Sequence, residues 1–151
     1  GAKGFASELE NLALSVENEE SLSTINQNYQ NLFEAIHQNE LFVDEENKSI
    51  DKKILLAISI LEVAAEEYAI GIVNGEVKNK FEYQDALGFT KMARVVLENI
   101  VTDEKSQKIR LSKMLEIIDS LFVLWPELVP INKVDGDSNS IKVAIEKIKN
   151  F

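Results

Sequence analysis

The acidic side chains in the middle of the chain are the ones best suited to chemistry. Glu62 and Glu66 stand one helical turn apart before a tight turn, and Glu82 and Asp85 follow that turn. Carboxylate oxygens are the ligands that hard cations prefer, so we predict a metal site formed by Glu62, Glu66, Glu82 and Asp85. A structural role competes with this prediction and takes precedence, since acidic residues in the first turn of a helix are common for dipole reasons alone.

The segment Glu34-Ala35-Ile36-His37 has the Glu-x-x-His spacing of di-iron helical bundles. A ligand in such a bundle must project inward, but Glu34 lies roughly 150° from the centre of its helix's apolar stripe. His37 is the chain's one histidine. We therefore expect a Glu–His pair on the surface.

A second acidic segment follows the spacing of a calcium-binding loop. Asp135, Asp137, Asn139 and Glu146 occupy its positions 1, 3, 5 and 12. Ser140 stands where the sharp turn of such a loop needs glycine, so we prefer a helix-capping role for these residues. The absence of cysteine excludes thiolate ligands and Cys nucleophiles, and a single histidine disfavours a Ser-His-Asp triad.

Apolar periodicity near 3.6 residues predicts helices as the elements that position these side chains. The predicted helical segments cover residues 5–16, 22–36, 50–73, 79–100, 109–125 and 140–151. The acidic segment Glu17-Asn18-Glu19-Glu20 is expected to separate the first two helices. The sequence therefore predicts an all-α fold, an antiparallel four-helix bundle with one or two additional short helices, in a single domain over residues 1–151.

The chain is organised around the hairpin formed by the third and fourth of these helices. Asn74-Gly75 is expected to stop the first helix, because glycine accepts the left-handed backbone that closes a helix. Asn79 and Glu82 are expected to form a capping box at the start of the second helix. So short a connection makes the two helices antiparallel neighbours. Tyr68 and Tyr83 are expected to pack inside this hairpin before they serve any other role.

The same hairpin resembles the helical extracytoplasmic modules attached to bacterial high-affinity iron permeases. The residues that carry the resemblance cover about one-sixth of the chain and are Tyr68, Ile72, Asn74-Gly75, Val77, Glu82-Tyr83, Asp85 and Phe89. The resemblance implies a location outside the cytoplasm, iron as the cation and a membrane iron permease or another protein as the partner. Gly71 departs from it, because the family more often has Ala there. The sequence lacks Arg-Glu-x-x-Glu and Cys-x-x-Cys-His signatures, so transport and electron transfer do not carry over.

The net negative charge of the chain disfavours some classes of binding partner. A net charge of −10 argues against nucleic acid and anionic membrane surfaces, whose recognition depends on Lys and Arg. Acidic residues interrupt the most apolar segment, so we expect no direct membrane insertion. The start, Gly1-Ala2-Lys3-Gly4, is compatible with removal of a signal peptide, and we expect a periplasmic or otherwise extracytoplasmic location.

These observations predict a non-enzymatic helical-bundle module that is accessory to iron uptake, through weak metal binding or partner docking. Two alternatives remain open. A ferritin-type carboxylate metal oxidase would need inward-facing ligands on several helices. A protein-interaction module would receive a partner helix in an exposed apolar groove.

Overall fold

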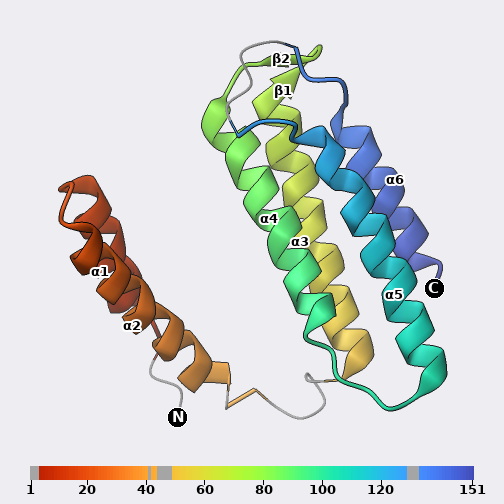
Figure 1. Ribbon diagram of the computed structural model, residues 1–151, viewed down its shortest axis with the longest axis horizontal. Helices are drawn as coiled ribbons and strands as arrows, with labels where there is room; N and C mark the ends of the chain where they lie inside the picture. Colours follow the sequence, from red (N-terminus) through yellow and green to blue (C-terminus); the bar gives the residue numbers. More distant parts are fainter. Residues whose placement is uncertain (1–3, 41, 44–48, 129–132) are drawn as a thin grey trace. The chain divides into compact units, whose positions relative to one another are not determined.

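The computed structural model describes residues 4–40, 42–43, 49–128 and 133–151. In these ranges it contains six α-helices and one short antiparallel ribbon of two strands (Figure 1). The predicted all-α class is therefore confirmed. The chain divides into two compact units, Gly1–Lys48 and Ser49–Phe151, which we describe separately. One domain over residues 1–151 stays a prediction.

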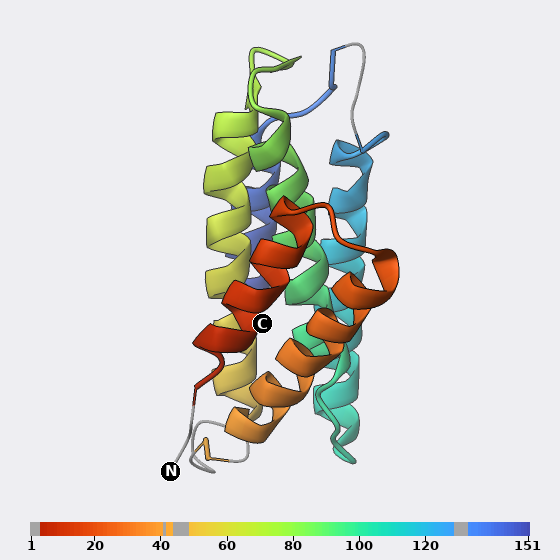
Figure 2. The same ribbon diagram turned by 90° about the vertical axis from the view of Figure 1, so that its left-hand side faces the viewer.

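The first unit is a hairpin of helices α1 (Ala6–Glu17) and α2 (Leu22–Glu40). The expected break over residues 17–20 is present, where Glu19 has a left-handed backbone with φ of 51°. The Ser21 hydroxyl then accepts a hydrogen bond from the backbone N–H of Thr24 and caps α2. At the open end, the Asn39 side chain bonds both N–H and C=O of Gly4, which fixes the helices as antiparallel neighbours (Figure 2). With 19 residues, α2 is longer than the short helix expected.

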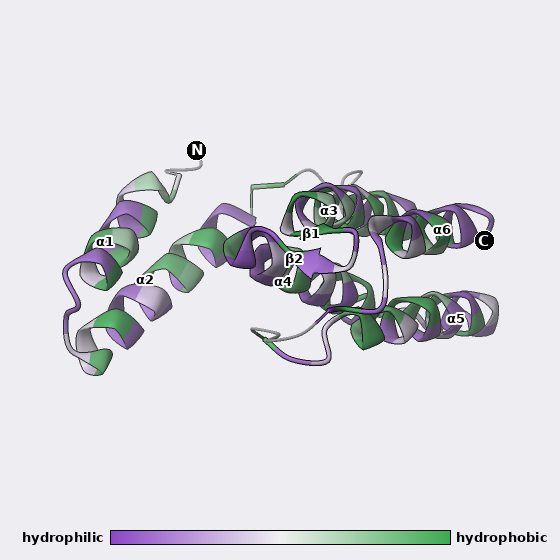
Figure 3. Ribbon diagram, turned by 90° about the horizontal axis from the view of Figure 1, so that it is seen from above, coloured by the Kyte–Doolittle hydropathy of each residue, from purple (hydrophilic) through white to green (hydrophobic). Residues whose placement is uncertain are grey.

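The second unit is an antiparallel four-helix bundle, as predicted. Its helices are α3 (Ile50–Gly71), α4 (Lys80–Glu98), α5 (Lys105–Leu121) and α6 (Ser138–Lys149), and a turn of 3₁₀ helix, η2 (Phe122–Leu124), extends α5. α3 packs against α4 and α6, and α5 packs against the same two helices (Figures 1 and 3). Apolar residues from every helix are buried in one core, among them Ile58, Leu61, Ala86, Leu97, Met114, Ile118, Ile141 and Ile145.

Short polar side chains set where the bundle helices begin. The side-chain oxygens of Ser49, Asn79 and Asp137 accept hydrogen bonds from the backbone N–H groups of Lys52, Phe81 and Asn139. Each satisfies a donor that has no partner within its helix. α5 lacks such a cap and begins at Lys105, four residues before the expected start.

The turn between α3 and α4 differs from the expectation. α3 ends at Gly71, and the next residues form strands β1 (Ile72–Val73) and β2 (Glu76–Val77). Asn74 and Gly75 have φ values of 54° and 76°, and two positive φ angles are what a two-residue type I′ hairpin requires. The prediction that Asn74-Gly75 directly stops the helix was therefore wrong, because these residues turn a β-ribbon instead. The antiparallel packing of α3 and α4 was right.

Candidate functional site

Carboxylates from α3 and α4 meet beside the ribbon. A side-chain hydrogen bond with Glu82 is the largest cause of a raised pKa at Glu67, and partial burial adds to it. The negative charges of Glu82, Asp85 and Glu66 raise the pKa further. Two neighbouring carboxyl groups resist ionising together, because their like charges repel. Three of the four predicted site residues, Glu66, Glu82 and Asp85, are thus close enough to raise the pKa of Glu67, a residue that the sequence analysis missed.

The sequence analysis missed Glu67 because its contact with Glu82 depends on how closely α3 and α4 approach, and spacing along the chain does not give that distance. Gly71 could have indicated this close approach, because it lies one helical turn after Glu67 on the same face of α3. A Cβ at Gly71 would lie 2.6 Å from the backbone nitrogen of Tyr83. Glycine at this position therefore marks the face of α3 that contacts α4, and Glu67 lies on that face.

Glu62 does not join the cluster. Its carboxylate accepts a hydrogen bond of 3.2 Å from the Nζ of Lys149 on α6, which also bonds Glu146. These bonds to Glu62 and Glu146 raise the pKa of Lys149. Glu62 therefore connects α3 to α6, and a cation is already paired with it.

The cap of α4 involves the cluster, but not as a capping box. Asn79 is the N-cap residue as expected, yet its oxygen accepts from Phe81 rather than from Glu82. The Asn79 backbone N–H donates to the Gly71 carbonyl at 3.2 Å. Glu82 therefore contacts the Asn79 side-chain amide, at 3.4 Å, instead of that N–H group. The carboxylate of Glu82 serves both the helix start and its contact with Glu67.

The cluster is not a preformed metal centre. Within the described ranges, no group of three or more His, Asp or Glu residues is arranged to hold a metal ion. The Glu67–Glu82 pair offers two carboxylates, so a cation bound there would take its remaining ligands from water. Such a site would bind weakly and exchange readily.

Tyr68 and Tyr83 lie in the core at the same end of the bundle, as the expected packing role requires. Trp125 stands edge-on to Tyr68, with ring centroids 5.2 Å apart, and its Nε1–H donates to the Tyr83 carbonyl at 2.9 Å. Both tyrosine hydroxyls lie 3.3 Å from the Leu124 carbonyl. Burial raises the pKa of both tyrosines. These contacts give the two tyrosines a structural role, in which Trp125 closes the end of the bundle.

The other two acidic motifs have structural roles. His37 is exposed and lies 3.4 Å from Glu40, while Glu34 accepts from Gln38 at 2.7 Å. The expected surface pair of Glu34 with His37 was therefore wrong, because His37 pairs with Glu40 instead. In the calcium-like segment, Asp137 caps α6 and Glu146 pairs with Lys149, which leaves neither free as a ligand.

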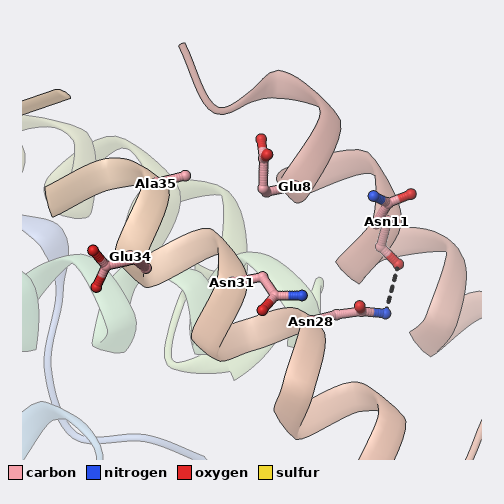
Figure 4. Close-up of a pocket in the computed structure, with 6 residues that line it drawn as sticks. All are labelled: Glu8, Asn11, Asn28, Asn31, Glu34 and Ala35. Carbon is pink, nitrogen blue, oxygen red and sulfur yellow. Dashed lines mark hydrogen bonds between the residues drawn. The ribbon is translucent and has the colours of Figure 1, made fainter. Parts of the chain in front are cut away.

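Two open hollows lie in the described parts of the units. One, of about 380 Å³ between α1 and α2, is lined by Glu8, Asn11, Asn28, Asn31, Glu34 and Ala35 (Figure 4). In it, Asn28 donates to the backbone carbonyl of Asn11. The other, of about 500 Å³ beside the ribbon, includes Asp135 and Asp137. Both are shallow and polar, and neither brings together a set of groups suited to catalysis.

Comparison with known families identifies the bundle. The family model described as the iron permease-associated 4-helix bundle domain matches residues 43–150. The chain belongs to this family. The match includes all four bundle helices and the ribbon, so the resemblance carried by the α3–α4 hairpin is confirmed, and α1 and α2 lie outside the matched residues. Searches of curated proteins and of solved structures gave no match. Within the described residues, no helix is long and apolar enough to span a membrane.

Proposed function

We propose that this iron permease-associated domain is a non-enzymatic, extracytoplasmic accessory of a membrane iron permease that holds iron cations weakly at Glu67 and Glu82. Glu66 and Asp85 add negative charge around this pair. Glu62, the fourth residue of the predicted site, is left out because Lys149 already neutralises it.

The proximity of the Glu67 and Glu82 carboxyl groups, which raises the pKa of Glu67, carries the proposal. Two carboxylates in contact repel one another once both are ionised, and the bound proton relieves that repulsion. A metal cation can replace the proton, because metal binding requires deprotonated ligands and releases their protons. Iron favours such oxygen ligands in its ferric state, which fits a domain of this family.

Two features would keep the affinity low. The protein supplies only two carboxylates in contact, and Glu82 lies in the first turn of α4, where the positive end of the helix dipole opposes a cation. Weak, exchangeable binding suits delivery of iron to a permease better than storage.

Metal titration of the whole chain tests the proposal. Ferrous iron under anaerobic conditions, gallium as a redox-inert stand-in for ferric iron, and calcium would be titrated into the parent and into Glu82→Gln. We expect saturable binding of gallium that is lost in Glu82→Gln and weakens as pH falls, because protons compete for the same oxygens.

Glu62→Gln is the matched control, since it removes a carboxylate of α3 that pairs with Lys149 and lies outside the Glu67–Glu82 pair. Its metal affinity should equal that of the parent. An equal loss of metal affinity in Glu82→Gln and Glu62→Gln would mean that the general negative charge of the surface attracts the metal. Absence of saturable binding in the parent would reject iron binding by this domain. Circular dichroism would verify that each variant keeps its helices.

A further inference from the structure

Taken as a unit by itself, the α1–α2 hairpin leaves an apolar face uncovered. Within the described part of this unit, Ser15 is the one fully buried side chain, and α2 buries none. Several large apolar residues instead remain exposed. Leu14 stands apart on α1, and six others, 40% to 79% exposed, form what we call the apolar face: Phe5, Leu9, Val16, Leu22, Tyr29 and Phe33. The rings of Tyr29 and Phe33 lie side by side on it, with centroids 6.2 Å apart. Two helices alone cannot bury such a surface.

These residues lie on one side of the hairpin. α1 meets α2 near Leu12 and Ser15, and Leu9 and Val16 lie roughly 90° round the helix from that contact at 100° per residue. On α2, Tyr29 and Phe33 are offset from its α1-facing residues by a similar angle in the same rotational sense. Antiparallel helices wind in opposite senses when seen from one end. Equal angular offsets from the contact therefore place the apolar residues of α1 and those of α2 on the same side of the hairpin.

The other side of the hairpin is polar. The hollow of Figure 4 opens there, lined by asparagines and glutamates. Asn11 lies roughly 200° round α1 from Leu9, which places it away from the apolar face. The hairpin as a whole is thus an amphipathic layer with one side suited to water and one side suited to a partner.

The charge of the hairpin selects among partners. Residues 1–48 contain ten Asp and Glu against two Lys, whereas residues 49–151 contain sixteen acids against fourteen Lys and Arg. Residues 4–43 contain no Lys or Arg at all. Glu17, Glu19 and Glu20 flank one end of the apolar face, and Glu40 flanks the other end. Like-charge repulsion opposes a second copy of this hairpin and an anionic membrane, and it favours a cationic partner.

We propose that the apolar face binds an amphipathic helix of another protein that carries Lys or Arg along its flanks. Apolar side chains of that helix would cover Tyr29 and Phe33, and its cations would pair with Glu17, Glu19, Glu20 and Glu40. This is helix-on-helix recognition by apolar anchors with charges at the rim. The apolar face belongs to the first unit and lies outside the residues that match the family, so the proposal does not depend on the iron site proposed in the second unit.

The test measures binding of designed peptides to the whole chain by isothermal calorimetry. The probe is an amphipathic Leu/Lys helix of the length of α2, compared with a Leu/Glu peptide of the same pattern and with a scrambled Leu/Lys peptide that has no apolar face. We expect the Leu/Lys helix alone to bind with micromolar or tighter affinity. Replacing Tyr29 and Phe33 together by Ala should weaken it at least about tenfold, the usual effect of removing aromatic anchors.

Controls separate this surface from general acidity. Asn31→Ala, on the polar side, should leave the affinity unchanged, and Glu17→Gln with Glu40→Gln should reduce both the affinity and its salt dependence. Equal binding of the scrambled peptide, or no effect of the aromatic substitutions, would overturn the proposal. Binding of the face to anionic vesicles in preference to the peptide would overturn it, as would dimerisation lost in the Tyr29 and Phe33 variant. The substituted side chains are exposed, so helix content should not change.

Discussion

Gly71 in α3 lies directly against the backbone of Tyr83 in α4. A Cβ placed on Gly71 would be 2.6 Å from the Tyr83 nitrogen and 2.9 Å from its Cα. The missing side chain lets the two helices approach at the ribbon end of the bundle. That approach brings Glu67 to Glu82 and holds Tyr83 beside Tyr68, with ring centroids 5.9 Å apart.

We predict that Gly71→Ala destabilises the bundle. The added methyl group meets backbone atoms, which cannot move aside as a flexible side chain can. The expected overpacking cost of about 1–3 kcal/mol exceeds the gain of up to about 1 kcal/mol in helix propensity. Urea unfolding followed by circular dichroism would measure the difference.

Gly88→Ala is the matched substitution with the opposite expected sign. Gly88 is an exposed residue within α4, and a Cβ there would meet no atom within 4 Å. Helix propensity alone should raise the free energy of unfolding by about 0.5–1 kcal/mol. Stabilisation by both substitutions would mean that the helices lie farther apart at Gly71 than the structure places them.

We predict that Trp125→Phe loosens the aromatic end of the bundle. The substitution removes the Nε1 hydrogen bond to the Tyr83 carbonyl and leaves unfilled space against Tyr68. We expect a loss of about 1–3 kcal/mol in the free energy of unfolding. Phe81→Leu is the comparison, since Phe81 is 64% exposed and should change stability by no more than about 0.5 kcal/mol.

We predict that Glu67→Gln raises the melting temperature at neutral pH. The pKa of Glu67 in the folded chain is raised above its usual value of 4.5, mainly by its hydrogen bond with Glu82. A raised pKa favours folding while the group is protonated, and that stabilisation is lost as pH rises through the folded pKa. At neutral pH the ionised pair therefore opposes folding, and the Gln amide can donate to Glu82 instead.

The dependence on pH is the decisive measurement. The difference in melting temperature between Glu67→Gln and the parent should shrink as pH falls below 4.5, where the parent is also protonated. Glu62→Gln should instead lower the melting temperature slightly at neutral pH, because it breaks the partly exposed ion pair with Lys149. A Glu67→Gln effect that is constant with pH would exclude a raised pKa at Glu67.

We predict that a chain shortened to residues 49–151 unfolds in one cooperative transition. Every buried apolar residue of the described chain lies in this unit, from Ile54 to Ile148. Loss of the cooperative transition in the shortened chain would support a single domain over residues 1–151.

Much of the fold follows from local sequence. Apolar spacing placed all six helices, and the caps at Ser49, Asn79 and Asp137 are side chains that bond backbone groups two or three residues away. Asn74-Gly75 shows the limit of this reasoning. Its left-handed backbone was predictable, but a helix stop and a type I′ ribbon turn both use that conformation, and the pairing of Ile72 with Val77 decides between them.

The candidate site depended more on tertiary structure. The sequence by itself determined that acidic residues cluster at the end of the α3–α4 hairpin, because helical spacing and a short turn bring those segments together. Only the tertiary structure decided that Glu67 meets Glu82 and that Glu62 meets Lys149 of α6. These partners depend on how each helix is rotated about its axis and how closely the helices pack. A one-dimensional pattern gives the apolar face of a helix, but it does not say which neighbour each flank of that face will contact.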